Sequence, residues 1–206
     1  MSSTLTIALP KGRLLTRIIT CFKEAGIQVA FAERELVCLD KKNKLKFLLV
    51  KNNDLTTYVH HGIAGLGICG EDRIIESGYR FYKLHEFPFG STRICLAGCP
   101  SVEGEKEEPR LKVATKFPRF TQNFFLKRGI PVEMIKLEGS VELAPVLGLA
   151  PYIVDLVETG STLKAHGLEI LEELADIKVV LISNPAYYKL EYQDIDHLVH
   201  KLGKQP

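Results

Sequence analysis

The stretch that decides the fold of this chain reads IVDLVETGSTL over residues 153–163. Its first half is a short apolar run, which is typical of a buried strand. Two carboxylates, Asp155 and Glu158, stand at the end of that run, and three hydroxyl side chains then surround Gly160. Glycine permits a positive φ and a close approach of the backbone to a ligand. One short loop therefore offers amide and hydroxyl groups for a phosphate, beside carboxylates suited to ribose hydroxyls.

The same loop has a plainer interpretation as an ordinary strand–turn–helix corner. In that case Ser161 or Thr162 would be the N-cap of a helix that starts near Thr162. The loop is not a Walker loop, because no Gly-Lys-Ser/Thr sequence follows it. From the loop alone, a phosphate site and a capped helix start both remain open.

The residues upstream of this loop extend the pattern and match one family. The matching positions, with every spacing kept, are Glu142, Gly148, Ala150, Ile153, Asp155, Leu156, Thr159, Gly160, Thr162 and Leu163. They resemble the signature of the ATP phosphoribosyltransferases, which catalyse the first step of histidine biosynthesis. Further similar strings are LPKGRL at 9–14, GICGED at 67–72, ATKFP at 114–118 and KLEGSVE at 136–142. The resemblance covers nearly the whole chain.

The composition is that of an ordinary globular protein. The chain has 206 residues, of which 46% are hydrophobic and 25% charged, enough for one large domain or two small ones. A formal net charge of +2 predicts no general attraction to nucleic acid. The longest apolar run, residues 143–154, is too short and too interrupted to span a bilayer, and no signal peptide is seen. We therefore expect a cytoplasmic protein that binds neither nucleic acid nor membrane.

The cysteine pattern predicts no metal site. There are five cysteines, an odd number, and no Cys-x-x-Cys pair occurs. Cys95 and Cys99 are four residues apart, but no histidine lies close in sequence to complete a zinc set. Reduced, buried thiols are the expectation, and His60-His61 is interpreted as a helix end rather than a metal site.

Strands and helices alternate along the chain, which favours an α/β architecture with largely parallel sheets. Strands are expected at residues 5–9, 35–39, 46–50, 66–69, 82–87, 92–97, 111–114, 131–137 and 178–183, with a turn at 88–91 and a loop at 101–110. Helices are expected at residues 14–25, 53–61, 72–76, 119–127, 141–147 and 185–202. Residues 168–174 are compatible with either a strand or a helix.

Three turns, at residues 11–13, 70–72 and 155–162, each follow a strand. Ligands of such sheets bind beyond the carboxyl ends of the strands, so we group these turns as one candidate site. Lys11 and Arg13 place two cations at a strand-to-helix junction. Taken alone, these cations are either solvated loop charges or ligands for anionic oxygens.

The resemblance implies a fold like that of the type II periplasmic binding proteins, with two α/β lobes and the active site in the cleft between them. The first lobe is expected to comprise residues 1–92 and 180–206, because the chain crosses back. The second lobe, residues 93–179, would carry the phosphate loop. The chain stops at Pro206 and resembles the short form of the family, which lacks a C-terminal histidine-binding domain. Short forms form a hetero-oligomer with a separate regulatory subunit that resembles histidyl-tRNA synthetase.

The resemblance also implies the reaction. The ring nitrogen N1 of ATP attacks the anomeric carbon of phosphoribosyl pyrophosphate (PRPP), and pyrophosphate leaves. Mg²⁺ would arrive bound to PRPP, so no protein metal site is expected. Unprotonated N1 needs no general base, so the work of the enzyme is to position both substrates and to neutralise the leaving group.

The site residues follow by similarity, position by position. PRPP is expected to contact Lys51, Asp155, Glu158, Thr159, Gly160, Ser161 and Thr162, with Asp155 on the ribose hydroxyls. ATP is expected to contact Arg13, Gly70, Glu71, Asp72 and Ser140. The positions expected to serve catalysis are Lys11, Arg34 and Glu142.

Three residues depart from the family pattern. Lys51 stands where arginine is usual, and lysine cannot form a bidentate fork with a phosphate. Cys69 replaces a usual threonine, and Thr92 replaces a usual cysteine. Two other functions are compatible with the sequence: a phosphoribosyltransferase for another base, and a non-catalytic two-lobed solute-binding module, since a fold does not fix a function.

Overall fold

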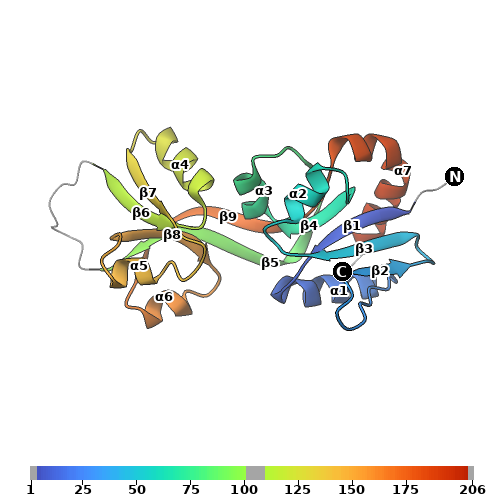
Figure 1. Ribbon diagram of the computed structural model, residues 1–206, viewed down its shortest axis with the longest axis horizontal. Helices are drawn as coiled ribbons and strands as arrows, with labels where there is room; N and C mark the ends of the chain where they lie inside the picture. The colour runs from blue at the N-terminus through green and yellow to red at the C-terminus, as the bar shows by residue number, and fades with distance from the viewer. Residues whose placement is uncertain (1–3, 101–109, 204–206) are drawn as a thin grey trace. The chain divides into compact units, whose positions relative to one another are not determined.

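The computed structural model describes residues 4–100 and 110–203 of the chain. Two compact units are present: Met1–Gly90 with Lys178–Pro206 form the first, and Ser91–Ile177 form the second. Two long strands, β5 (Tyr82–Gly98) and β9 (Glu169–Ser183), each run from one unit into the other (Figure 1). The loop expected at 101–110 lies outside the described residues except for Arg110.

The first unit is built on strands in the order β2-β3-β1-β4-β9. Their bounds are β1 Leu5–Pro10, β2 Val37–Asp40, β3 Leu45–Val50 and β4 Leu66–Gly70. Strand β1 lies between β3 and β4 and is parallel to both, whereas β2 and β9 run antiparallel to their neighbours. The parallel strands therefore end at one common edge of the sheet.

The described part of the first unit contains four helices: α1 (Arg13–Glu24), α2 (Leu55–His60), α3 (Glu71–Ser77) and α7 (Pro185–Leu202). Helix α1 buries Ile18, Cys21 and Phe22, which share one face at a spacing of three and four residues. Helix α7 begins after Asn184, as the sequence indicates. Oδ1 of Asn184 accepts hydrogen bonds from the N–H groups of Ala186 and Tyr187, the usual N-cap arrangement.

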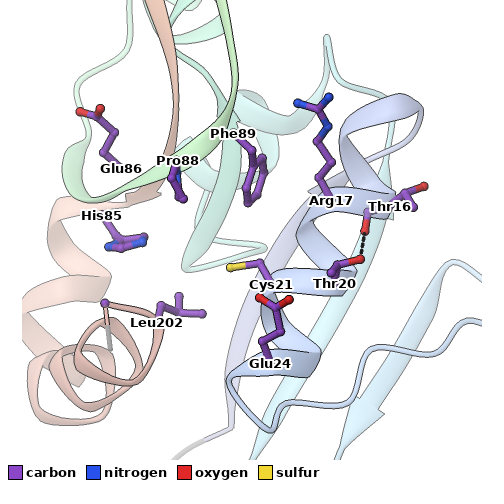
Figure 2. Close-up of a pocket in the computed structure, with 11 residues that line it drawn as sticks. Thr16, Arg17, Thr20, Cys21, Glu24, His85, Glu86, Pro88, Phe89 and Leu202 are labelled. Atoms are coloured by element: carbon purple, nitrogen blue, oxygen red, sulfur yellow. Dashed lines mark hydrogen bonds between the residues drawn. The ribbon is translucent and has the colours of Figure 1, made fainter. Parts of the chain in front are cut away.

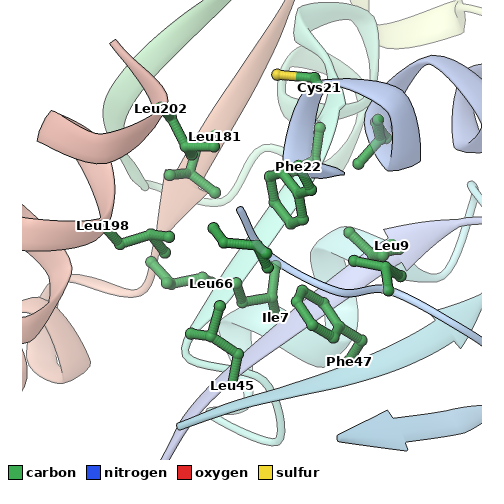
Figure 3. Packing of buried hydrophobic residues seen from close by; sticks show 14 of the residues in the cluster. Ile7, Leu9, Cys21, Phe22, Leu45, Phe47, Leu66, Leu181, Leu198 and Leu202 are labelled. Carbon is green, nitrogen blue, oxygen red and sulfur yellow. The ribbon is translucent and has the colours of Figure 1, made fainter. Parts of the chain in front are cut away.

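The main core of the first unit draws on both ends of the chain (Figure 3). Ile7 and Leu9 of the central strand are fully buried and pack with Phe22 of α1 and Phe47 of β3. The C-terminal segment adds further apolar side chains to the same cluster, among them Leu181, Leu198 and Leu202. This core therefore depends on residues that lie on both sides of the second unit in the sequence.

The second unit contains the sheet order β5-β8-β6-β7, with β6 at Leu111–Thr115, β7 at Val132–Lys136 and β8 at Tyr152–Val157. Strand β6 is parallel to both β7 and β8, and β8 is antiparallel to β5. Its helices are α4 (Pro118–Lys127), α5 (Leu143–Val146) and α6 (Ser161–Ala165). A separate core includes Cys95, Ala114, Val141, Ile153 and Leu163.

The expected turn at residues 88–91 is wrong, because β5 continues through it as one strand. Phe87 is buried and Phe89 packs against the main core of the first unit, while Pro88 stays exposed. This side-chain burial outweighs the turn preference of Pro88 and Gly90. Residues 169–174 are strand, part of the continuous β9, and Leu168 lies just before it. Helix α5 is shorter than the helix expected at 141–147.

Candidate active site

The predicted phosphate loop connects β8 to α6. Gly160 is the N-cap of α6 and has a φ of 76°, the left-handed region that favours glycine. Neither Ser161 nor Thr162 is the N-cap, so the interpretation of this turn as a hydroxyl-capped helix start is wrong. Both residues instead begin the helix with exposed side chains.

The hydroxyls of this loop contact each other. Oγ1 of Thr159 lies 3.0 Å from Oγ of Ser161, and the Ser161 N–H donates weakly to Oγ1 of Thr159 at 3.4 Å. Helix α6 spans only Ser161–Ala165, so its macrodipole adds little at this end. Any anion held here would depend on the hydroxyls and the backbone amides.

Asp155 lies in β8, just before this loop, and its side chain is only 15% exposed. The Leu156 N–H donates to Oδ1 at 2.8 Å, and Nζ of Lys116 lies 3.1 Å from Oδ2. Burial raises the pKa of Asp155 above its ordinary value; Lys116 and the Leu156 amide oppose this rise, and the charge of Glu142 adds to it. Burial has the larger effect on this carboxyl.

Two predicted residues of the second unit precede α5. Glu142 is the N-cap residue of α5 and is close enough to act electrostatically on Asp155. Ser140 has a φ of 47°, which is uncommon for a residue other than glycine. The second unit therefore brings Glu142, Lys116 and Asp155 into one electrostatic group at the start of the phosphate loop.

The predicted cations of the first unit lie at the edge where its parallel strands end. Lys11 follows β1 and Lys51 follows β3, and these strands end together, because Pro10 pairs with Val50 and the Lys11 N–H donates to the Val50 carbonyl at 2.8 Å. The Leu36 carbonyl accepts a hydrogen bond from the Leu49 N–H of β3 at 2.8 Å. Arg34, two residues before Leu36, therefore lies near the end of β3. Lys11, Arg34 and Lys51 are all exposed.

The predicted ATP residues of the first unit occupy neighbouring positions on this edge. Arg13 is the first residue of α1, and Gly12 before it has a φ of 113°. Gly70 ends β4, which is parallel to β1, and Glu71 and Asp72 form the first turn of α3. The fold therefore gathers the predicted residues of this unit at the carboxyl ends of β1, β3 and β4.

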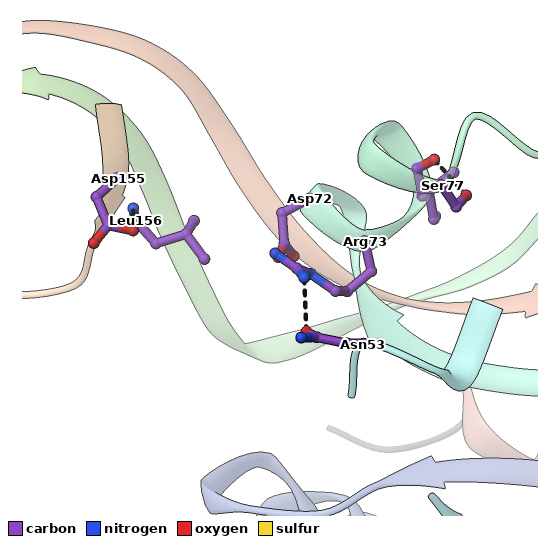
Figure 4. A network of polar contacts seen from close by, with 7 residues as sticks. Asn53, Asp72, Arg73, Ser77, Asp155 and Leu156 are labelled. Carbon is purple, nitrogen blue, oxygen red and sulfur yellow. Dashed lines mark hydrogen bonds and ion pairs between the residues drawn. The ribbon is translucent and has the colours of Figure 1, made fainter. Parts of the chain in front are cut away.

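The two carboxylates of the α3 turn already have protein partners. Asp72 is buried and pairs with Nε of Arg73 at 2.6 Å, while Nη1 of Arg73 donates to Oδ1 of Asn53 at 2.8 Å (Figure 4). Glu71 accepts hydrogen bonds from Nζ of Lys83 and from the Lys178 N–H. Although burial opposes it, these donors hold the pKa of Glu71 below its ordinary value.

Comparison with known proteins decides the family. A family model described as ATP phosphoribosyltransferase matches residues 51–204. The ATP phosphoribosyltransferase of Clostridioides difficile (strain 630) is 43% identical over 197 residues, which cover 95% of this chain and 95% of that protein. The protein of the same name from Caldanaerobacter subterraneus subsp. tengcongensis is 44% identical over 200 residues, 96% of this chain and 95% of that protein. The chain belongs to the ATP phosphoribosyltransferase family.

Solved structures agree with this membership. The ATP phosphoribosyl transferase (HisG:HisZ) complex from Thermotoga maritima superposes with a TM-score of 0.85 at 34% identity, covering 97% of each chain. The alkanesulfonate-binding protein SsuA from Xanthomonas axonopodis pv. citri, bound to MOPS, gives a TM-score of 0.61 at 12% identity, over 98% of this chain and 73% of that one. The second likeness shows the fold alone. The predicted α/β fold of the type II periplasmic-binding-protein class is confirmed, as is the predicted class of enzyme, a pentosyltransferase.

Two residues outside the predicted set contact residues within it. Lys116 pairs with Asp155, and Arg73 joins Asp72 to Asn53. A signal for Lys116 was present, because the matching string at 114–118 places it directly after a strand. Its partner was not evident, because the pairing of β6 with β8 is a tertiary feature.

The departures from the family pattern have clear positions. Cys69 is fully buried in β4, and burial raises the pKa of its thiol far above the ordinary value, so it stays protonated. Thr92 is half-buried in β5, and Lys51 is exposed at the end of β3. All five cysteines are free; four are buried and Cys99 is half-buried.

Within residues 4–100 and 110–203, no group of three or more His, Cys, Asp or Glu side chains could hold a metal ion. No helix in these ranges is long and apolar enough to cross a membrane. A cavity of about 790 Å³ lies in the first unit between α1, β5 and the end of α7 (Figure 2). It is lined by Arg17, Cys21 and Phe89 among others, and none of the predicted site residues lines it.

Proposed function

We propose that this chain transfers the phosphoribosyl group of PRPP to N1 of ATP, giving phosphoribosyl-ATP and pyrophosphate, the first step of histidine biosynthesis. Family membership over nearly the full chain is the observation that carries this proposal. The arrangement of the site supports it, because both units place their predicted polar residues at the carboxyl ends of parallel strands.

In this proposal the second unit holds the phosphoribosyl half of PRPP. Thr159, Ser161 and Thr162 donate hydroxyl hydrogen bonds to the 5′-phosphate, and the positive φ of Gly160 turns backbone amides toward it. Asp155 accepts hydrogen bonds from the ribose hydroxyls, and Glu158 borders the ribose. Support comes from the exposed loop hydroxyls, which neither cap α6 nor lie in a core.

The cations of the first unit would neutralise the leaving group. Lys11, Arg34 and Lys51 are exposed on one sheet edge, as groups that meet a mobile, highly charged pyrophosphate should be. Charge accumulates on pyrophosphate as the bond to the anomeric carbon breaks, so cations fixed in advance stabilise the transition state. The attack by N1 needs correct placement rather than a base.

ATP would be bordered by Arg13, Gly70, Glu71, Asp72 and Ser140, and Glu142 would lie near the reacting groups. The engaged carboxylates of Glu71 and Asp72 indicate that these residues shape the wall of the nucleotide site. Arg13, exposed at the start of α1, would meet the triphosphate.

A magnesium ion would neutralise the pyrophosphate oxygens of PRPP when bound. The described residues offer no set of three protein ligands, and Mg²⁺ commonly binds through substrate phosphates with few protein contacts. An ion that arrives with PRPP would need few protein contacts, and the carboxylates of Asp155 and Glu158 could supply oxygen ligands to it.

We also propose a hetero-oligomer with a regulatory subunit that resembles histidyl-tRNA synthetase. The support is the structural likeness to a chain of a complex described as HisG:HisZ. A cytoplasmic location would suit five free thiols, because disulfides persist in oxidising compartments.

The test is pyrophosphate release from PRPP and Mg²⁺ by the purified chain with its regulatory subunit. ATP, GTP, adenine and orotate are compared as acceptors, and the product is identified by mass spectrometry. Among the four acceptors, we expect only ATP to support pyrophosphate release, with phosphoribosyl-ATP as the product. Release with another base but not with ATP would assign a different transferase, and binding of PRPP without release with any acceptor would favour a solute-binding module.

A further inference from the structure

We propose that Lys116 is a positioning residue for PRPP, which holds the carboxylate of Asp155 in the orientation that receives the ribose hydroxyls. Nζ of Lys116 lies 3.1 Å from Oδ2 of Asp155. The inference rests on the proposed function, in which Asp155 contacts ribose.

The contacts of Asp155 fix its carboxylate without saturating it. Lys116 lies at Oδ2, and the Leu156 N–H donates to Oδ1 at 2.8 Å. An ionised carboxylate has about four lone-pair positions, so both oxygens keep acceptor capacity for ribose hydroxyls. The two donors together restrict rotation of the group, because each binds a different oxygen.

A buried hydroxyl network fixes the backbone beneath Lys116. Thr115 is fully buried, and its Oγ1 donates to the carbonyl of Val154 at 2.7 Å while accepting from the Phe117 N–H at 2.9 Å. Oγ1 of Thr121, also fully buried, donates to the Phe117 carbonyl at 2.8 Å. The Thr115 hydroxyl therefore links Thr115 and Phe117, on either side of Lys116, to Val154, the residue before Asp155.

The strand register explains why Lys116 meets Asp155. Thr115 pairs with Val154 where β6 and β8 run parallel, so the residue after each lies at the next position along the same edge. Lys116 leaves β6 at that point, and its side chain is 34% exposed, open to solvent on one side. A lysine at this position reaches Asp155 with its side chain while its backbone is held in place.

The charge of Lys116 helps to keep the carboxyl group of Asp155 ionised. Burial and the charge of Glu142 both favour the protonated carboxyl, while Lys116 favours the ionised one. On the neighbouring strand β5, Cys95 pairs in register with Asp155; burial raises the pKa of its thiol, so it stays neutral and adds no charge. Without Lys116, Asp155 would protonate at a higher pH and accept fewer hydrogen bonds from ribose.

The experiment uses Lys116→Met, which removes the charge and keeps the length of the side chain. Initial rates are measured with the regulatory subunit present, varying PRPP and ATP separately between about pH 5 and 9. We expect the KM for PRPP to rise about tenfold, from the loss of a charge-assisted contact, with the KM for ATP nearly unchanged. We also expect the acidic limb of kcat/KM for PRPP to move up by about one pH unit.

Two matched variants separate positioning from a general loss of structure. Lys112→Met removes the same charge from the same strand β6, and it should change neither the KM for PRPP nor the pH profile. Lys116→Arg keeps the cation and should retain most of the wild-type affinity and the wild-type acidic limb. Equal losses for ATP and PRPP with no shift of the acidic limb would overturn the proposal.

A double-mutant cycle with Asp155→Asn distinguishes failure of this inference from failure of the proposed function. If Lys116 acts through Asp155, Lys116→Met should have little further effect on PRPP once Asp155 is Asn. A full additional loss in that background would mean that Lys116 contacts the substrate itself and would overturn the positioning role. If Asp155→Asn alone leaves the KM for PRPP unchanged, the ribose assignment of Asp155 fails instead.

Discussion

The backbone N–H of Lys178 donates a hydrogen bond to Oε2 of Glu71 at 3.2 Å, across 107 positions of sequence. The other oxygen, Oε1, accepts from Nζ of Lys83 in β5. One carboxylate therefore joins the first turn of α3 to both long strands of the first unit. This is a structural role for a residue that the sequence associates with ATP.

Glu71→Gln should lower the stability of the protein more than its affinity for ATP. The variant loses the charge shared by the two donors, and we expect a loss of about 1 kcal/mol after allowing for partial exposure. In a chain of this size the melting temperature should fall by about 2–4 °C. Differential scanning calorimetry and the KM for ATP are the two measurements.

The pH dependence gives an independent check on Glu71. Its pKa is lowered in the folded protein, so its stabilisation is fully present above the ordinary glutamate pKa of about 4.3 and is lost as pH falls through the lower folded value. The difference between wild type and variant should shrink on acidification. Glu86→Gln, at a surface pair with Lys178, is the control and should have little effect. A large loss of ATP affinity with unchanged melting would contradict this role.

Gly160→Val should abolish tight PRPP binding while Gly160→Asn retains part of it. A Cβ at Gly160 would meet Val157 at 3.8 Å, ordinary contact, so the constraint is the φ of 76° rather than space. Asparagine tolerates this region and a β-branched residue does not, at a cost of about 1–2 kcal/mol. The KM values for PRPP and ATP report the effect.

The control for Gly160 is Gly129, which has a φ of 69° and open space where an added Cβ would lie. Gly129→Val should carry a similar loss of stability with no change in PRPP affinity. If both valine variants reduced PRPP affinity equally, the backbone of the 158–162 loop would have no special part in binding.

Thr162→Ala should weaken PRPP binding more than ATP binding. The hydroxyl is exposed and is not used to cap α6, so its removal should leave folding almost unchanged. Loss of one hydrogen bond to a charged phosphate corresponds to about 1.5–3 kcal/mol, a rise in the KM for PRPP of tenfold or more. Thr57→Ala, an exposed threonine of α2, is the control. Equal effects on both substrates would place the wrong substrate on this loop.

Thr115→Val should destabilise the second unit by about 1–3 kcal/mol, because it removes the buried hydroxyl that donates to the Val154 carbonyl and accepts from the Phe117 N–H. Urea unfolding measures the change. Thr92→Val, in the half-buried part of β5, should have a much smaller effect. A near-neutral Thr115→Val would show that the buried network is not what holds this end of β6.

Local signals in the sequence predicted most of the strands and helices. Alternation of apolar segments indicated β1, α1, β6 and β8, and the residues after those strands are the ones that the fold brings to the strand ends. Asn184 and Pro185 indicated the start of α7 correctly. The strands, the helices and the start of α7 depend on residues close together in sequence, which determine hydrophobic periodicity and helix capping.

The sequence could not predict features set by distant partners. Pro88 and Gly90 have strong turn preferences, yet β5 runs through them because Phe87 and Phe89 are drawn into a core that α1 and α7 complete. Gly160 rather than Ser161 is the N-cap of α6, a choice of backbone conformation that the TGST sequence leaves open. The ion pair between Lys116 and Asp155 depends on strand order, which no local pattern encodes.

The passage of β5 and β9 through both units has a consequence for synthesis on the ribosome. Residues 91–177 emerge as one continuous piece, so the second unit is complete while the first still lacks the part of β9 from Lys178 onward and α7. Until Val179–Ser183 is synthesised, β4 of the nascent first unit has no neighbour on the side that this segment occupies. An open strand edge of this kind is prone to aggregation. A segment translated after the second unit therefore completes the first unit, and slow elongation after residue 177 would prolong the time during which that edge stays open.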